Sequence, residues 1–201
     1  MIDLKDKVIL ITGAGKGCGR TLAEAFAQRG AIVAANDISP INVEEAVNGI
    51  NQQGGRAKAY IEDVAKKLGA QHIINQVEDD FGRLDILIHH ATVEPHIPLL
   101  NMDEWDWHRV LDVNLTGAFL MTQSAGRVMR EKGSGVVIFL ITEPTRDEKS
   151  EAAFVASMDG VRGLARQAAR ELSPHGIQVF AVEGQAVVKS VFTLLDGVEE
   201  K

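Results

Sequence analysis

The sequence has few features that support covalent cross-links or membrane spans. It has one cysteine, Cys18, and no apolar run long enough to cross a bilayer. A lone cysteine cannot form an intramolecular disulfide, and its position in a glycine-rich turn favours a packing role over redox chemistry. No signal-type stretch precedes the first strand-like segment, so we expect a cytoplasmic protein.

Basic residues are also in deficit. Lys and Arg number 21 against 28 Asp and Glu, which gives a formal net charge of -7. This charge repels phosphate backbones and anionic lipid surfaces. We therefore expect no nucleic-acid partner and no membrane partner.

Hydrophobic patterning predicts an α/β protein. The 201 residues, 45% of them hydrophobic, suit a single domain over 1–201. Short β-branched runs alternate with segments of helical period, which is typical of a Rossmann-like, doubly wound parallel sheet. Strands are expected at about 7–12, 31–36, 57–61, 84–90, 135–142 and 177–182, and helices at about 17–29, 42–53, 65–81, 103–131, 151–172 and 186–195.

A glycine-rich turn joins the first strand to the first helix. Gly13, Gly17 and Gly19 follow Thr12 in the spacing Gly-x-x-x-Gly-x-Gly. Glycines let the backbone turn tightly and approach a pyrophosphate, whose negative charge the helix start favours. The second strand ends in Asp37, a carboxylate placed to accept hydrogen bonds from adenosine ribose hydroxyls and to repel a 2′-phosphate.

The turn and several later segments together resemble the short-chain dehydrogenase/reductase family. The later segments include Leu84-Asp85-Ile86-Leu87-Ile88, Val113-Asn114-Leu115-Thr116-Gly117 and Gly176-Ile177-Gln178-Val179. The resemblance implies a single dinucleotide-binding domain with NAD as cofactor, although the base Lys16 favours NADP mildly. The cofactor-binding positions it implies are Gly13, Gly15, Lys16, Gly17, Cys18, Gly19, Asp37, Asp63, Val64, His90 and Ala91.

The chemistry that the family performs needs an Asn, a Ser, a Tyr and a Lys. Asn114 matches the first of these, as a catalytic or as a purely structural residue. The Ser position falls on Thr142 or Glu143, depending on a small gap. The Tyr and Lys positions fall on Phe154 and Met158, which share one helix face without a phenol or an ammonium group.

Other polar residues offer no obvious replacement. The only tyrosine, Tyr60, lies on the third predicted strand near the adenine side, and we expect a core or rim position for it. His89 and His90 stand where the family has two asparagines, and adjacent strand residues point to opposite faces. We therefore expect no metal site.

The C-terminal part departs from the family as well, because it lacks the usual substrate loop and the last strand. The resemblance implies an oxidoreductase of small carbonyl or alcohol substrates, and the changed residues predict that catalysis is impaired or absent. The alternative is a non-catalytic NAD sensor or an inactive partner subunit. Homodimers or hetero-oligomers would form through the predicted helices at 103–131 and 151–172.

Overall fold

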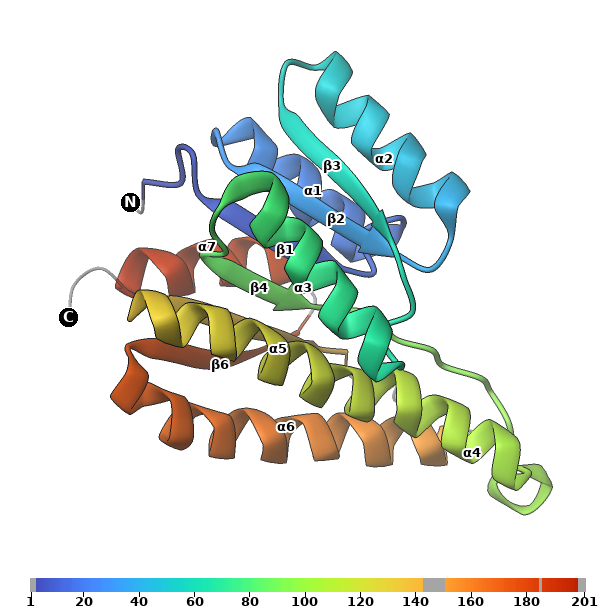
Figure 1. The fold of residues 1–201 in the computed structure, drawn as a ribbon. Coiled ribbons are helices and arrows are strands. Elements are labelled where there is room, and N and C mark those ends of the chain that lie inside the picture. The colour runs from blue at the N-terminus through green and yellow to red at the C-terminus, as the bar shows by residue number, and fades with distance from the viewer. Residues whose placement is uncertain (1–2, 143–150, 185, 199–201) are drawn as a thin grey trace.

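The computed structural model describes residues 3–142, 151–184 and 186–198. Its parallel strands form one sheet in the order β3-β2-β1-β4-β5-β6, with helices on both faces (Figure 1). The predicted doubly wound sheet of about six strands is confirmed. The strands are β1 (Val8–Thr12), β2 (Ile32–Asp37), β3 (Arg56–Ile61), β4 (Ile86–His89), β5 (Gly135–Ile141) and β6 (Ile177–Glu183).

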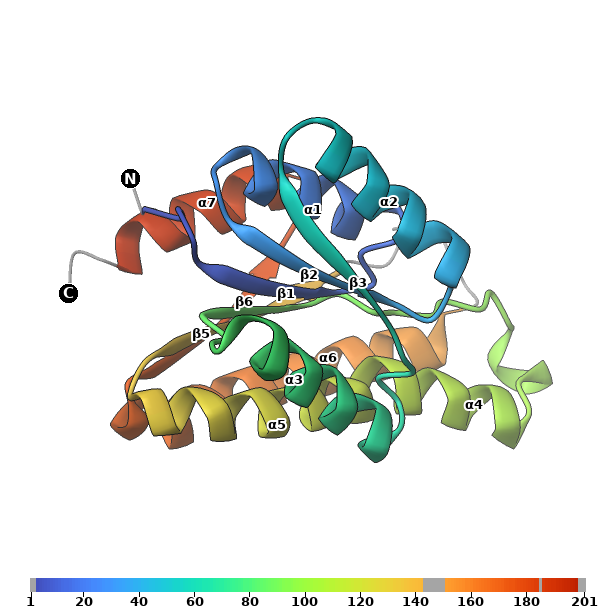
Figure 2. The same ribbon diagram turned by 45° about the horizontal axis from the view of Figure 1, so that its top comes forward.

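Two hydrophobic cores lie on either side of the sheet, and strand alternation decides which side chain enters which core. On β1, Val8 and Leu10 face one core, while Ile9 and Ile11 face the other. Figure 2 shows α1, α2 and α7 above the sheet and α3, α5 and α6 below it. The long helices are α1 (Gly17–Gln28), α2 (Pro40–Gln52), α3 (Lys67–Phe81), α5 (Gly117–Lys132), α6 (Ala152–Leu172) and α7 (Val187–Val198).

The helix predicted over 103–131 is interrupted. It consists of α4 (Glu104–Leu111), a π-helical segment over Asp112–Thr116, and α5. The chain is helical over nearly the whole predicted range, but hydrophobic periodicity does not show the local change from i+4 to i+5 hydrogen bonds within it. The wider turn contains Asn114, whose buried side chain bonds to neighbouring segments.

The final helix closes the upper face. On α7, Phe192 packs against Phe26 of α1, with ring centroids 4.7 Å apart. The guanidinium of Arg29 lies 3.4 Å from the centroid of the Phe192 ring, so a cation covers the outer side of this contact. Within the described part of the chain, no helix has the length and apolar character needed to cross a membrane.

Candidate functional site

The candidate site lies at the carboxyl ends of β1 and β4. These two strands are neighbours, and the chain proceeds from β1 toward β3 on one side and from β4 toward β6 on the other. In open α/β sheets this reversal of strand order opens a crevice in which ligands bind. Thr12 ends β1 and His89 ends β4, so both residues lie at its edge.

Two glycines of the turn after β1 differ in the space around them: one has no room for a side chain, and the other faces open space. A Cβ on Gly19 would lie 2.1 Å from the carbonyl oxygen of Gly13, so only glycine fits there. Gly17, with φ +53°, would place a Cβ in open space with nothing within 4 Å. The turn thus presents an open backbone surface at the start of α1, where helix N–H groups could hold an anion.

Asp37 is fixed beside this turn by two backbone donors. The Gly15 N–H donates to Asp37 Oδ2 over 3.0 Å, and the Ser39 N–H donates to Asp37 Oδ1 over 2.9 Å. A Cβ on Gly15 would lie 2.8 Å from Asp37 Oδ2, so glycine is needed for this approach. The carboxylate therefore has a defined orientation at the end of β2, and its remaining lone pairs can accept hydroxyl donors.

A small pocket of about 130 Å³ continues from Asp37. Asp63 and Val64, which follow β3, line it together with Gly13 and Ala91. Asp63 Oδ1 accepts a hydrogen bond from the Ala65 N–H at 2.9 Å, which orients that carboxylate. The structure thus brings together four of the predicted cofactor positions with Asp37 around one cavity.

Lys16 and Cys18, also predicted as cofactor positions, flank the open glycine. Lys16 is exposed at the residue that precedes α1, and its side chain makes no capping hydrogen bond. Cys18 is partly buried against the upper core, and this burial raises the pKa of its thiol. A raised pKa keeps the thiol protonated, which agrees with a packing role.

Thr12 ties the ends of β1 and β4 together. Its hydroxyl oxygen accepts hydrogen bonds from the N–H groups of His90, at 3.0 Å, and Ala91, at 3.1 Å. Its own proton then points to His89 Nδ1, 3.1 Å away. His89 must therefore accept at Nδ1 and carry its proton on Nε2.

Both histidines lie in places that oppose protonation. Desolvation, followed by repulsion from His90, lowers the pKa of His89 from 6.5 to about 3. Desolvation also lowers the pKa of His90. His89 Nε2 and His90 Nδ1 are buried and have no hydrogen-bond partner among the described residues, so each imidazole is neutral and incompletely satisfied.

His90 packs on the opposite side from His89. A Cβ on Gly19 would lie 3.1 Å from His90 Cδ2, which places the ring against the first turn of α1. His89 instead lies edge-on to Phe139 of β5, with ring centroids 6.3 Å apart. Among the residues that the structure describes, no group of three His, Cys, Asp or Glu side chains is arranged to hold a metal ion.

Asn114 uses its side chain to join three segments. Its Oδ1 accepts from the Val93 N–H at 2.8 Å, and its Nδ2 donates to the Val93 carbonyl at 3.0 Å and to Ser157 Oγ at 2.9 Å. Ser157 in turn donates to the Phe154 carbonyl at 2.7 Å. This network holds the π-helical turn against the connection after β4 and against α6.

Phe154 and Met158 lie on the buried face of α6. Both belong to the lower core, with exposed fractions of 1% and 2%. Thr142, one of the two candidates for the serine position, is exposed at the end of β5. Glu143, the other candidate, lies outside the described residues.

Tyr60 is remote from this chemistry, as predicted. It is 2% exposed on β3, and its hydroxyl donates to Asp80 Oδ2 at 2.7 Å. Burial, followed by the bond to Asp80, raises the pKa of Tyr60 well above its ordinary range. The phenol therefore remains protonated and serves packing.

Sequence reasoning missed two residues of this region. Arg109 of α4 lines the small pocket, and Ser157 of α6 completes the Asn114 network. A weak signal existed for Ser157, because it follows Phe154 by three residues and so shares its helix face. Arg109 gave no such signal, since its position at the pocket depends on how α4 packs in the folded chain.

A dinucleotide-binding crevice on a doubly wound sheet defines the general class of this protein. A family model described as short chain dehydrogenase matches residues 7–193. The chain belongs to this family, whose members are NAD(P)-dependent oxidoreductases.

Curated relatives agree with the family match. An uncharacterized oxidoreductase of Thermotoga maritima is 36% identical over 187 residues, which cover 90% of this chain and 72% of the relative. D-threitol dehydrogenase of Mycolicibacterium smegmatis is 32% identical over 186 residues, covering 92% of this chain and 72% of the enzyme.

Solved structures show the same likeness in three dimensions. The NAD+-bound structure of a xylitol dehydrogenase has a TM-score of 0.85 at 28% identity and covers 90% of this chain and 71% of that protein. A metagenomic short-chain oxidoreductase in complex with NADP has a TM-score of 0.88 at 26% identity, covering 96% and 92%.

Proposed function

We propose that this chain binds NAD(H) in the crevice and that its proton-transfer step is impaired or lost. In this proposal residues 1–201 act as one dinucleotide-binding domain. The open backbone at Gly17 holds the pyrophosphate at the start of α1. Asp37 accepts hydrogen bonds from the adenosine ribose hydroxyls, and Asp63 and Val64 contact the adenine.

The remaining predicted positions complete the proposed cofactor site. Gly13 and Gly19 permit the close turn, and Gly15 lets Asp37 approach the loop. Lys16 and Cys18 flank the phosphate, while His90 and Ala91 form the wall contributed by β4. The fixed negative charge of Asp37 disfavours a 2′-phosphate, which supports NAD over NADP.

The observation that carries the impairment is the apolar face of α6. Phe154 and Met158 stand where the family resemblance places the proton-donating tyrosine and its lysine, and both are almost fully buried. Neither side chain can donate or accept a proton. The amide groups of Asn114 are engaged with Val93 and Ser157, which supports a structural role for this residue.

Bound NADH supplies a hydride, and a reductase must also protonate the oxygen of the carbonyl that receives it. In this chain Thr142 provides an exposed hydroxyl just after β5, and a threonine hydroxyl is by itself a poor acid. The residues thus support cofactor binding better than turnover of small carbonyl or alcohol substrates.

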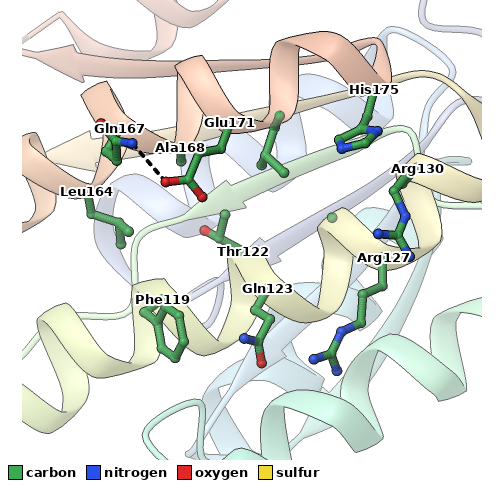
Figure 3. A pocket seen from close by; sticks show the side chains of 12 residues that line it. Phe119, Thr122, Gln123, Arg127, Arg130, Leu164, Gln167, Ala168, Glu171 and His175 are labelled. Carbon is green, nitrogen blue, oxygen red and sulfur yellow. Dashed lines mark hydrogen bonds between the residues drawn. The ribbon is translucent and has the colours of Figure 1, made fainter.

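The alternative role is an NAD sensor or an inactive partner subunit. A groove of about 330 Å³ between α5 and α6 favours the subunit role (Figure 3). Phe119 and Leu164 supply apolar walls, with Arg127 on one helix and Glu171 on the other. An apolar groove with a positive charge on one side and a negative charge on the other can pair with the same groove of a second copy, because each charge then faces its opposite.

Binding and turnover test the proposal in one series. Calorimetric titration of the purified chain should give a micromolar-range Kd for NADH and weaker binding of NADPH. Asp37→Asn removes the charge but keeps an acceptor, so it should narrow the gap between the two cofactors. Absence of binding to either cofactor would refute the dehydrogenase and sensor roles together.

Turnover is then measured with NADH and a panel of small carbonyls. The parent chain should show little activity, and the double variant Phe154→Tyr with Met158→Lys should gain roughly a hundredfold or more. Each single variant and a thermal melt serve as controls for folding, because Met158→Lys introduces an ammonium at a buried position. Rapid turnover by the parent would show that proton transfer is intact.

A further inference from the structure

We propose that Arg109 forms one wall of the adenine site and stacks its guanidinium on the adenine ring. The inference rests on the proposed function, because it requires a dinucleotide in the crevice. Arg109 belongs to the last turn of α4 and lines the same pocket as Asp37 and Asp63. Neither of these carboxylates can stack on a purine, whereas a planar guanidinium can.

The charges around the pocket leave Arg109 available to a ligand. It is the only basic residue in the described lining, which also contains the carboxylates of Asp37, Glu62 and Asp63. Asp37 and Asp63 accept backbone N–H bonds, and Glu62 lies 2.6 Å from His72 Nδ1. Within the described residues Arg109 has no ion pair, while the acidic lining attracts its charge toward the cavity.

Trp105 limits where the guanidinium can go. It precedes Arg109 by one helical turn on α4, and Arg109 Cζ lies 5.7 Å from the centroid of its ring. Trp105 is 67% exposed, so the contact restrains the arginine side chain against the surface of α4 and leaves it accessible. Less rotamer entropy is then lost when the guanidinium packs on a ligand.

The rest of the pocket supplies apolar surface for the same ring. Ile38, directly after Asp37, is 67% exposed and lines the cavity together with Val64 and Val113. A purine is flat, apolar on its faces and polar along its edge. Apolar side chains and a planar cation suit its faces, while Asp63 suits its amino edge.

A contact to a 2′-phosphate is the competing role for an arginine at this place. The geometry favours adenine because the ribose end of the pocket already holds the anchored carboxylate of Asp37, which repels a phosphate. The two roles predict different ligand dependence. Stacking affects every adenine nucleotide, whereas a phosphate contact affects NADPH alone.

The test is a set of titrations of the full chain with NADH, NADPH, ADP-ribose and nicotinamide mononucleotide. Arg109→Ala should weaken NADH and ADP-ribose binding by roughly 5- to 20-fold, as expected for a cation over an aromatic ring. Arg109→Lys should recover only part of this loss, because lysine keeps the charge without the plane. Nicotinamide mononucleotide, which has no adenine, should be unaffected.

Arg166→Ala is the matched control, since Arg166 is exposed on α6 and does not line the pocket. Unchanged NADH and ADP-ribose binding by Arg109→Ala, with binding by the parent intact, would overturn the stacking role alone. A loss confined to NADPH would assign Arg109 to the 2′-phosphate instead and also overturn it. Failure of the parent to bind any adenine ligand would overturn the proposed function itself.

Discussion

At the residue scale, the hydroxyl of Thr12 determines the state of His89. Because it accepts from the N–H groups of His90 and Ala91, its proton is directed to His89 Nδ1. The remaining proton of His89 lies on Nε2, which is buried and has no partner in the part of the chain that the structure describes. Protonating this ring would add a buried charge beside Thr12 and Phe139, where no carboxylate among the described residues bonds to it.

This arrangement predicts that stability falls in mild acid. The folded-state pKa of His89 is depressed from 6.5 to about 3, so its contribution is complete above the unfolded value and is lost as the pH falls below it. From about pH 7.5 to about pH 5.5 the free energy of unfolding should drop by roughly 1 kcal/mol from this residue. His90, whose pKa is also lowered, adds to the same trend.

Urea unfolding of the parent and of His89→Asn at the two pH values measures this effect. Between the two pH values the free energy of unfolding of His89→Asn should fall much less than that of the parent. Each protein is compared with its own stability at the higher pH. His72→Asn is the control, because His72 is 55% exposed and its replacement should leave the buried pair unchanged. An equal pH dependence in the parent and in His89→Asn would contradict the assignment.

At the scale of elements, two glycines in the turn between β1 and α1 have different roles. Packing requires one of them, and the other lies on the proposed phosphate surface. Gly19 is closed by the Gly13 carbonyl, whereas the Cβ position of Gly17 is open. Backbone geometry also matters at the end of α4, where the π-helical turn directs the side chain of Asn114 inward to bond with Ser157. Backbone geometry, more than side-chain chemistry, therefore shapes the crevice.

Gly17→Ala and Gly19→Ala should fail in different ways. Gly17→Ala should cost about 1 kcal/mol of stability for its positive φ, yet weaken NADH binding roughly tenfold or more, because the methyl group occupies the proposed phosphate surface. Gly19→Ala should cost on the order of 3 kcal/mol, since its methyl group meets a backbone oxygen.

Melting curves and NADH titrations of both variants check this difference. Gly82→Ala is a useful control, because Gly82 also has a positive φ and open space but lies after α3, away from the turn. It should lose similar stability to Gly17→Ala and retain binding. If Gly17→Ala bound NADH as the parent does, the pyrophosphate would not lie on this turn.

At the scale of the whole molecule, the groove between α5 and α6 is the surface feature that could join two copies of the chain. Gly126 of α5 and Leu172 of α6 both line it, and a Cβ on Gly126 would make only an ordinary contact with Leu172. The groove retains Phe119, which is 44% exposed on α5. This surface lies apart from the nucleotide crevice, so association and cofactor binding can be tested separately.

The groove predicts a homodimer that a single charge disrupts. Sedimentation of the parent should give twice the chain mass, and Phe119→Glu should shift the protein to the monomer because it places a carboxylate on an apolar wall of the groove. Leu68→Glu is the matched control, since Leu68 is 79% exposed on α3 and does not line the groove. A monomeric parent would rule out this contact between copies.

Much of the fold could be predicted because its signals are local. Alternating β-branched runs and helical periods predicted the order of elements, and the glycine spacing with Asp37 predicted where a dinucleotide would bind. Hydrophobic periodicity alone does not show the π-helical turn at Asn114, because hydrogen bonds to Val93 and Ser157 stabilise it from outside the segment. Nothing in the sequence pattern places Arg109 at the pocket, since its neighbours there come from distant segments that meet only in the folded chain.

By itself the sequence determined the class of fold, the glycine turn, the carboxylate of Asp37 and the apolar residues Phe154 and Met158. These follow from composition, periodicity and spacing, which are properties of neighbouring residues. Only the tertiary structure decided the protonation of His89, the engagement of Asn114 and the surroundings of Arg109. Thr12 and His89 are 77 positions apart, and a hydrogen bond between such residues exists only once β1 and β4 lie side by side.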